Sequence, residues 1–502
     1  MAVTSSPASS AESTDTRSHV IMDLASELTH ALGAQYVRVS ADSLLSYGYD
    51  ASFLEGTPEL VALPGSTDDV VRIVRAAKRA GVPVIARGSG TGLCGGAVPV
   101  RGGVVVSMTR MNRVLHIDAR NRRATVEPGV INLDLSHATA PYGLYYAPDP
   151  GSQKISTIGG NVATNAGGPH CLALGVTTNH VLAVEAVLPD GRVVWFGGKD
   201  GDLDAPGYDL LGAVVGSEGT LAIVTKIVVR LMRSPEAVRT MLAVYPDIAS
   251  GSASVSAIIG AGIIPSALEM MDADICRAVE NHFHAGYPED AGSVLLIELD
   301  GAREQVEAQR ERVEALCKAN GAREVRTARS EEERAGLWAG RKGAAGALGQ
   351  LAPNYYLQDA VVPRSRLPHI MARVGEIARE FRLTIPNVFH AGDGNLHPAM
   401  LFDRRENGAI ERVIEAGNAL LRSCVDMGGT VSGEHGIGLE KRDALPLIMS
   451  TQDLAAMARL RTCFDPHLMF NPDKLFPAEF SCVEVRDPLA GLDPSQPGPW
   501  FC

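Results

Sequence analysis

The stretch Ala86-Arg87-Gly88-Ser89-Gly90-Thr91-Gly92-Leu93-Cys94-Gly95-Gly96 is the part of the sequence from which the fold is predicted. It follows the apolar run Val82–Ile85, which is typical of a buried strand. Five of its residues are glycine, which adopts positive φ readily and lets backbone amides approach a ligand. Successive amides in such a loop form an anion site suited to a diphosphate. The stretch therefore predicts a loop that binds a nucleotide cofactor by its phosphates, with a glycine-rich turn between two buried strands as the alternative.

Two common phosphate-binding motifs do not fit this stretch. Gly90-x-Gly92-x-x-Gly95 matches the dinucleotide fingerprint, but that fingerprint must open a helix. Here Pro99 and Gly102-Gly103 follow, and then the strand-like run Val104–Val106. A Walker loop requires a Gly-Lys-Ser/Thr sequence, and the stretch contains no lysine.

Length and composition exclude several classes of protein. A chain of 502 residues exceeds the usual size of a single core, so two or more domains are expected. The net charge is −12, without a basic run, which argues against nucleic-acid binding. No run of 18 apolar residues is present, so no transmembrane segment is expected. The eight cysteines are scattered without a C-x-x-C motif, which excludes the usual iron–sulfur spacings and indicates a reducing compartment, the cytoplasm.

The succession of strand-like and helix-like runs predicts an N-terminal half built around a βαβ unit, followed by a second, α+β domain. Residues 1–18 are polar and are expected to be disordered. A strand at 61–63, a helix at 67–80 capped by Thr67, and the strand at 82–85 deliver the glycine loop. Residues 181–188 and 192–196 flank Pro189-Asp190-Gly191 and predict a hairpin. The composition changes at Ser234-Pro235, where the second domain is expected to begin.

Two histidines are predicted to lie on one face of a second hairpin. Asp393-Gly394 is a strong signal for a two-residue turn. A turn centred there pairs His390 with His397, whose Cβ atoms would then be about 5 Å apart. Two histidines and a carboxylate are a common catalytic zinc arrangement, and Glu434 is the carboxylate that we add. The alternative is one buried polar histidine and one that faces solvent.

Three glycine-rich stretches together resemble the FAD-binding domain of the vanillyl-alcohol oxidase family, the p-cresol methylhydroxylase (PCMH) type fold. The resemblance implies that the first holds the pyrophosphate and that the second, residues 148–168, and the third, residues 216–220 with Ile223, line the rest of the flavin. The first loop contains no histidine for covalent attachment, so the resemblance implies non-covalent FAD, and His170 is expected to be a spectator. The implied FAD-binding residues are Arg87, Gly88, Ser89, Gly90, Thr91, Gly92, Leu93, Pro148, Asp149, Ser152, Thr157, Gly159, Gly160, Asn161, Asn165, Gly167, Gly168, Gly216, Glu218, Gly219, Ile223 and Asn471.

The second half resembles the D-2-hydroxyacid dehydrogenases, and within them the flavin-bearing glycolate oxidase subunits and D-lactate dehydrogenases. The stretches that carry this resemblance are 337–342, 387–398, 432–438 and 471–476. It implies a PCMH-type domain at 19–235 and an α+β substrate (cap) domain with an antiparallel sheet at 236–430. A C-terminal helical segment at 431–480 would complete the active site and pack on the FAD domain, and 481–502 would be a tail.

The resemblance also implies roles in the oxidation of a 2-hydroxy acid. Arg341 would bind the substrate carboxylate with its guanidinium fork. His390, His397 and Glu434 would hold a divalent metal, with zinc expected. His435 would accept the hydroxyl proton, since its ordinary pKa suits a base at neutral pH; a hydrogen-bonding histidine beside the ligands is the alternative.

The predicted substrate is a small monocarboxylate, glycolate or D-lactate. Ala345, Leu357 and Ala399 occupy the positions where relatives acting on D-2-hydroxyglutarate bring polar residues. A D-2-hydroxyglutarate dehydrogenase, a non-redox metal hydrolase and an inactive scaffold subunit that only holds FAD are the alternatives.

Electrons would leave through partners, because the sequence has no iron–sulfur motif of its own. The resemblance implies partner subunits, one of them an iron–sulfur protein, or else a homodimer, with attachment to the inner membrane through those partners.

Overall fold

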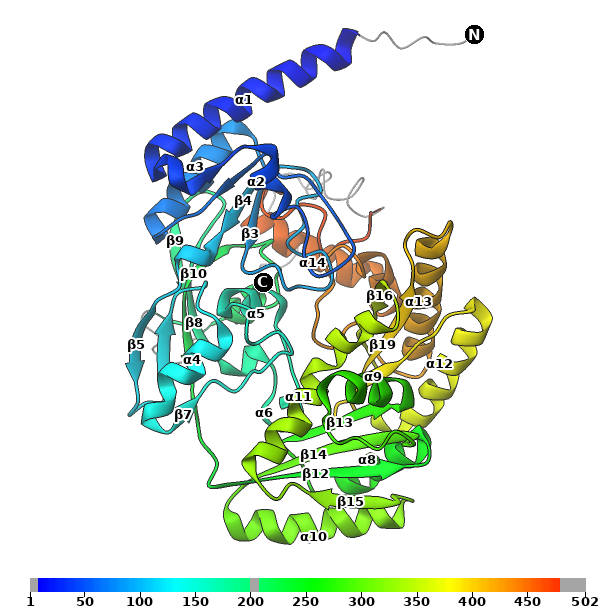
Figure 1. Ribbon diagram of the computed structural model, residues 1–502. Coiled ribbons are helices and arrows are strands. Elements are labelled where there is room, and N and C mark those ends of the chain that lie inside the picture. The colour runs from blue at the N-terminus through cyan, green and yellow to red at the C-terminus, as the bar shows by residue number, and fades with distance from the viewer. Residues whose placement is uncertain (1–7, 199–206, 479–502) are drawn as a thin grey trace, which may run out of the picture.

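The computed structural model describes residues 8–198 and 207–478, so the predicted tail at 481–502 lies outside the described residues. Figure 1 shows the N-terminal half, coloured blue to cyan, beside a sheet coloured green to yellow. The orange C-terminal segment reaches back to the blue strands.

The first sheet carries the glycine-rich loop at the end of a parallel strand. It has the order β1-β2-β4-β3 and consists of β1 (Val37–Arg38), β2 (Leu60–Ala62), β4 (Val104–Ser107) and β3 (Val84–Arg87). Strands β2, β3 and β4 are parallel, and α3 (Thr67–Ala80) connects β2 to β3. The prediction of Thr67 as the N-cap is wrong. Ser66 has the extended backbone of an N-cap, and its side chain accepts a hydrogen bond from the Asp69 amide.

The N-terminal helix is longer than expected. Helix α1 runs from Ala8 to Leu32 and packs on α3, so the prediction of disorder is wrong for residues 8–18. Leu24 and Leu28 are buried, and a packed turn supplies the nucleus from which a helix extends at low cost. Residues 1–7 lie outside the described part of the chain.

The second sheet completes the N-terminal half. It is antiparallel and consists of β5 (Val114–Asp118), β6 (Arg123–Val126), β10 (Ile223–Arg230), β8 (Val181–Val187) and β9 (Val193–Phe196), in that order. The predicted hairpin at 181–196 is confirmed as β8–β9. Short elements fill the connections: α2 (Ala41–Leu45), α4 (Asn132–Thr139), α5 (Ile158–Thr164), α6 (Cys171–Leu174), α7 (Leu210–Val214), and the pair β7 (Leu144–Tyr145) and β11 (Met232–Arg233).

The third sheet forms the second half, and the predicted antiparallel arrangement is confirmed. Its order is β15 (Glu324–Thr327), β12 (Ala237–Tyr245), β14 (Ser293–Gly301), β13 (Ala267–Asp272), β18 (Asn387–His390), β19 (Asn395–Phe402) and β16 (Asn354–Leu357), with β17 (Ala360–Val361) also on β19. One face packs against α8 (Ile248–Gly260), α10 (Arg303–Ala319), α12 (Leu367–Phe381) and α13 (Ala409–Asp426). The other packs against α9 (Ala273–Phe283) and α11 (Glu331–Ala347).

Alternation along β18 and β19 decides which face carries the two histidines. Phe389 and Leu396 point into the core beneath α8 and α12, whereas Val388 and Ala399 belong to the core beneath α9 and α11. Because successive side chains in a strand point to opposite faces, His390 and His397 share the face of Val388. This face also carries α11 and therefore Arg341.

The predicted register of this hairpin is wrong, although the predicted face is right. His390 pairs with Asn395, and His397 pairs with Val388. Four residues, 391–394, therefore form the connection instead of two. The shift amounts to two residues, and an even shift leaves every side chain on its original face. The histidines are diagonal neighbours, and their ring centroids are 5.0 Å apart.

The C-terminal segment joins the first sheet to the third. After α14 (Thr451–Phe464), Phe470 is buried in the core of the first sheet, and the Asn471 amide donates to Val84 O at 2.8 Å. The four domain boundaries given above stay predictions. Among residues 8–198 and 207–478, every helix is too short or too polar to cross a membrane.

Candidate active site

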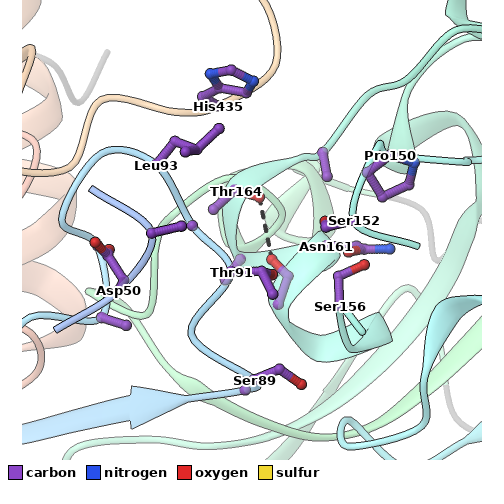
Figure 2. A pocket seen from close by; sticks show the side chains of 18 of the residues that line it. Asp50, Ser89, Thr91, Leu93, Pro150, Ser152, Ser156, Asn161, Thr164 and His435 are labelled. Carbon is purple, nitrogen blue, oxygen red and sulfur yellow. Dashed lines mark hydrogen bonds between the residues drawn. The ribbon is translucent and has the colours of Figure 1, made fainter. Parts of the chain in front are cut away.

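A cavity of about 640 Å³ lies between the glycine-rich stretches and the third sheet. All three glycine-rich stretches line it on one side, and residues of α11, β18, β19 and the segment after α13 line it on the other. Figure 2 shows side chains from both sides of this cavity, including Ser89 from the first loop, Asn161 from α5 and His435 from the C-terminal segment.

The first loop leaves room for backbone alone at two positions. A Cβ atom on Gly88 would lie 2.4 Å from Thr157 Oγ1. Gly90 has a φ of +72°, and a Cβ there would lie 2.1 Å from Arg87 Nη2. The hydroxyl of Thr157 is itself engaged, because it caps α5 by accepting from the Gly160 amide at 3.1 Å. The backbone of the first glycine-rich stretch therefore packs against the N-terminus of α5 in the second stretch. Backbone amides at a helix N-terminus are available to an anionic ligand.

Unpartnered polar atoms indicate that the cavity is built for a polar ligand. Asp50 Oδ2, Ser156 Oγ and Asn161 Nδ2 are buried and make no hydrogen bond, and all three residues line the cavity. Buried polar atoms are normally hydrogen-bonded. The diphosphate, hydroxyl groups and ring amides of FAD offer the missing partners, so the residues present fit this cofactor.

Most of the predicted FAD-binding residues line the cavity. They are Arg87, Gly88, Ser89, Gly90, Thr91, Gly92, Leu93, Ser152, Thr157, Gly159, Gly160, Asn161, Gly167, Glu218, Gly219 and Ile223. Contact of each with FAD stays a prediction.

The other predicted FAD-binding residues are outside the cavity lining, where at least one of them supports the loops. They are Pro148, Asp149, Asn165, Gly168, Gly216 and Asn471. Asn471 illustrates the role, since its Nδ2 donates to the carbonyl oxygens of Gly96 and Glu218 at 2.9 and 2.7 Å. Direct contact of these residues with the flavin also stays a prediction.

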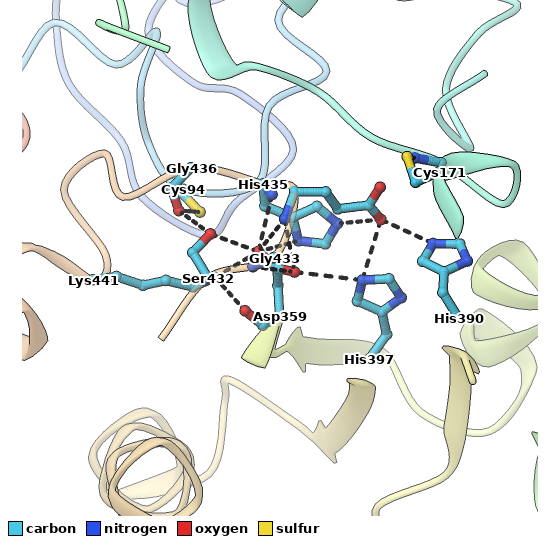
Figure 3. Close-up of polar contacts among 12 residues, drawn as sticks. Cys94, Cys171, Asp359, His390, His397, Ser432, Gly433, His435, Gly436 and Lys441 are labelled. Carbon is cyan, nitrogen blue, oxygen red and sulfur yellow. Dashed lines mark hydrogen bonds and ion pairs between the residues drawn. The ribbon is translucent and has the colours of Figure 1, made fainter. Parts of the chain in front are cut away.

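The three predicted metal ligands come together and all line the cavity; Figure 3 shows the rings of His390 and His397 side by side. Glu434 Oε1 lies 3.1 Å from His390 Nε2 and 3.2 Å from His397 Nε2. One ligand atom from each residue lies within 4.8 Å of the other two. All three side chains are largely buried.

Glu269 holds both His390 and Arg341. It lies directly opposite His390 in the pairing of β13 with β18, and its carboxylate oxygens are 2.8 and 2.9 Å from His390 Nδ1. The same carboxylate forms an ion pair with Arg341 Nη2. A carboxylate on Nδ1 leaves Nε2 as the nitrogen available to a metal, which is the usual arrangement behind a histidine ligand.

The residues present fit a divalent ion. His397 Nε2 is buried and makes no hydrogen bond of acceptable geometry, although it is close to Glu434. Burial disfavours a charge on His390, but Glu269 and Glu434 outweigh this effect and raise the pKa of His390 to about 10. Two carboxylates around one imidazole thus create a site that favours positive charge, and an ion at Nε2 would supply it.

His435 lies beside this cluster. Its ring stacks on His397 with centroids 4.9 Å apart, and its Nε2 is 3.6 Å from Glu434 Oε1. It also lines the cavity. Asp359, His397 and His435 form a second group whose ligand atoms lie within 4.8 Å of one another.

Sequence reasoning missed Asp50, Glu269, Asp359 and Lys441. Glu269 is 121 residues from His390 in sequence, and the partner of His390 depends on the neighbour that β18 acquires in the sheet. Asp359 and Lys441 are likewise joined by tertiary contact alone, with Nζ 3.0 Å from Oδ2. A buried charged residue in an apolar strand, such as Glu269 in Ala-Leu-Glu-Met-Met, was the one available signal.

Comparisons with known proteins match both halves of the chain. The family described as "FAD binding domain" matches residues 58–197, and "FAD linked oxidases, C-terminal domain" matches residues 234–475. The chain is 44% identical to the glycolate oxidase subunit GlcD of Escherichia coli (strain K12), over 85% of each chain. The chain belongs to the FAD-linked oxidase family.

Other similarities extend over most of this FAD-linked oxidase. It is 32% identical to a D-lactate dehydrogenase of Anaerostipes hadrus, over 86% of this chain and 91% of the relative. The structure of p-cresol methylhydroxylase with substrate bound superposes with a TM-score of 0.78 at 16% identity, covering 91% of this chain and 97% of that one. The predicted PCMH-type fold is thereby confirmed, as are the predicted cofactor FAD and the class of oxidoreductase.

His170 connects the two halves of this oxidase. Its Nδ1 lies 2.8 Å from Asp149 and its Nε2 lies 3.3 Å from Glu298 on β14, while its ring stacks on Trp338. Burial lowers the pKa of His170, but Asp149 and Glu298 outweigh that effect and raise it to about 10. Both ring nitrogens are engaged in ion pairs, and the expectation that His170 is a spectator in flavin attachment stays a prediction.

We expect the contribution of His170 to stability to decline in alkali. Because the pKa is about 10 in the folded protein and about 6.5 when unfolded, the contribution is complete below pH 6.5 and is lost as the pH rises toward 10. The advantage of wild type over His170→Gln in unfolding free energy should therefore shrink by roughly 1 kcal/mol or more between pH 6.5 and 9. Urea unfolding at both pH values measures it, with His116→Gln, at an exposed position, as the control. A constant difference would contradict the ion pairing.

Proposed function

We propose that this protein oxidises a small D-2-hydroxy acid, glycolate or D-lactate, to the 2-oxo acid with FAD as the electron acceptor. The names of the similar proteins support a hydroxy acid substrate. The observation that carries the proposal is the buried Nε of Arg341, which has no hydrogen-bond partner on a residue that lines the same cavity as His390, His397, Glu434 and the glycine-rich loops. A guanidinium with a free donor in a buried site suits a carboxylate.

The reaction requires that the substrate carboxylate is fixed, that the hydroxyl proton is removed and that hydride leaves Cα. Arg341 binds the carboxylate, and Glu269 keeps the guanidinium in place through its ion pair. His435, beside the cluster and on the cavity wall, accepts the hydroxyl proton. Bound FAD supplies the acceptor for the hydride, so that the products are the 2-oxo acid and reduced flavin.

His390, His397 and Glu434 would hold a divalent ion, which we propose to be zinc. Such an ion polarises a hydroxyl group and lowers its pKa. Glu434 Oε1 lies near Nε2 of both histidines, and a zinc ion held by these three residues would keep a position for a substrate, as catalytic zinc sites do.

The proposed limit on substrate size follows from the wall near Arg341. Ala345 and Leu357 line the cavity, and Ala399 is fully buried, so none of these positions offers a donor to a second carboxylate. Lys342 also lines the cavity, but its Nζ lies 3.7 Å from the carboxylate of Asp149. We therefore favour a monocarboxylate over D-2-hydroxyglutarate.

Anaerobic bleaching of the flavin by a panel of 2-hydroxy acids tests the substrate. Glycolate or D-lactate should reduce the flavin faster than D-2-hydroxyglutarate. Arg341→Lys should lower kcat/KM by about 10- to 100-fold, because the ammonium loses the second charged hydrogen bond, while the FAD content stays that of wild type. Faster bleaching by D-2-hydroxyglutarate would contradict the proposed substrate class.

Removal of divalent ions tests the proposed metal. After chelation, glycolate and D-lactate should no longer bleach the flavin, whereas dithionite should still do so because FAD stays bound. Added Zn²⁺ should restore bleaching in wild type and fail to do so in His390→Ala. Full activity in a metal-free preparation, verified by elemental measurement, would refute the metal's role.

We propose that electrons pass to a partner, either an iron–sulfur subunit or another acceptor protein, in the cytoplasm or at the inner membrane. Artificial dyes should then reoxidise the flavin at the rate of turnover, while oxygen should yield hydrogen peroxide at least about tenfold more slowly. A tenfold difference in rate corresponds to about 1.4 kcal/mol in activation free energy. Stopped-flow reoxidation measures both rates. Peroxide production that keeps pace with turnover would identify an oxidase instead.

A further inference from the structure

Asp359 is surrounded by hydrogen-bond donors from a single loop. It is completely buried, between β16 and β17, and it accepts the backbone amides of Gly433, Glu434 and His435 at 2.9–3.3 Å. The hydroxyl of Ser432 donates to Oδ2 at 2.8 Å. One carboxylate thus binds four consecutive residues, Ser432 through its hydroxyl group and the next three through their backbone amides (Figure 3).

Lys441 supplies the matching charge. Its Nζ lies 3.0 Å from Asp359 Oδ2 and 3.2 Å from the Asp359 carbonyl oxygen. Lys441 is almost completely buried, with 1% exposed. A buried carboxylate without a partner would be strongly disfavoured, so the ammonium group of Lys441 stabilises Asp359 in its charged form at this position.

The loop at 432–436 is held at its other end through Gly436, whose carbonyl oxygen accepts from Cys94 Sγ at 3.2 Å and lies 3.0 Å from Ser432 Oγ. It contains no regular helix or strand, and a Cβ on Gly433 would lie 2.4 Å from Asn395 Nδ2. Adjacent residues in such a loop direct their side chains differently, so the backbone orientation decides where the Glu434 carboxylate and the His435 ring lie. The three amide bonds to Asp359 fix that orientation.

Asp359 also belongs to a group with metal-ligand spacing, together with His397 and His435, but its contacts argue against ligation. Asp359 Oδ1 is 3.7 Å from His397 Nε2, and its Oδ2 is 3.9 Å from His435 Nδ1, distances that ligands of one ion could have. The other contacts of Asp359 are those that argue against an ion here. Its own oxygens already accept several amides, a hydroxyl and an ammonium group. A second cation at this position would be repelled by Lys441.

Building on the proposed function, we propose that Asp359 and Lys441 are a positioning pair for the reaction. The pair holds the loop so that Glu434 reaches His390 and His397 while His435 faces the substrate. Neither residue lines the cavity, so they act through the loop and contact neither FAD nor substrate.

The test uses the FAD-loaded full-length protein and three variants. Asp359→Asn keeps the size and removes the charge, Lys441→Met removes the partner, and Ser432→Ala removes a single donor and is the variant least disruptive to folding. Glu185→Gln is the matched control, because Glu185 is a buried carboxylate paired with Lys226 at 2.8 Å in the second sheet. Zn²⁺ affinity is measured by titration, FAD content by absorbance, and kcat and KM with the substrate found by bleaching.

The positioning pair predicts a particular pattern of effects. Asp359→Asn and Lys441→Met should weaken Zn²⁺ binding about 10- to 100-fold, as loss of groups that orient ligands does, and kcat should fall more than KM rises. FAD content should stay that of wild type, and Ser432→Ala should show the same pattern to a smaller extent. Glu185→Gln should match wild type in Zn²⁺ affinity and kcat.

Two other outcomes would overturn the assignment. If Asp359 were a ligand, removal of the competing ammonium would tighten Zn²⁺ binding in Lys441→Met. If Asp359→Asn, or Ser432→Ala when the former does not fold, matched wild type in both Zn²⁺ affinity and kcat, the pair would have no positioning role. A wild-type protein that neither binds Zn²⁺ nor is reduced by any 2-hydroxy acid would refute the proposed function, and this assignment with it.

Discussion

The structure depends on where the carboxylate of Glu434 lies. One of its oxygens is within 3.2 Å of both His390 Nε2 and His397 Nε2, which belong to the third sheet. The other abuts the second glycine-rich stretch, since a Cβ on Gly167 would lie 2.8 Å from Glu434 Oε2. Sheet, C-terminal loop and FAD-binding loops therefore meet at one buried charge. A buried carboxylate must be matched by positive charge, which the two histidines or an ion can provide.

Other buried carboxylates join the parts of the chain in the same way. Glu269 connects β13 to α11 and β18 through Arg341 and His390. Glu298 connects β14 to the N-terminal half through His170. Glu218 accepts the amides of Ile437 and Gly438 and so holds the far end of the loop that Asp359 holds at its start. Around the cavity the contacts between the two halves include directed polar bonds, which require defined geometry. Apolar contacts join the halves as well, since Phe470 lies in the core of the first sheet and Phe53 packs on Tyr356.

The sequence predicted the type of most elements but not their ends or register. The hairpin at 181–196 and the strand that precedes the glycine loop follow from local alternation and turn residues. The register of β18 with β19 was misassigned because Asp393-Gly394 forms part of a four-residue connection, which a two-residue turn rule does not anticipate. The predicted face of the two histidines is right because the register error is two residues, an even number. The extent of α1 was underestimated because the packing of Leu24 and Leu28 on α3 is a tertiary effect.

The sequence by itself determined the glycine-rich loops, the alternation that puts His390 and His397 on one face, and the residue types needed for the chemistry, because these depend on neighbours within a few positions. Only the tertiary structure decided that Glu269 faces both His390 and Arg341, that Asp359 binds the loop of Glu434, and that six predicted FAD-binding residues lie outside the cavity lining. These contacts join residues separated by tens to hundreds of positions. Such contacts are set by strand order and chain packing, and a local sequence pattern does not encode which distant strand becomes a neighbour.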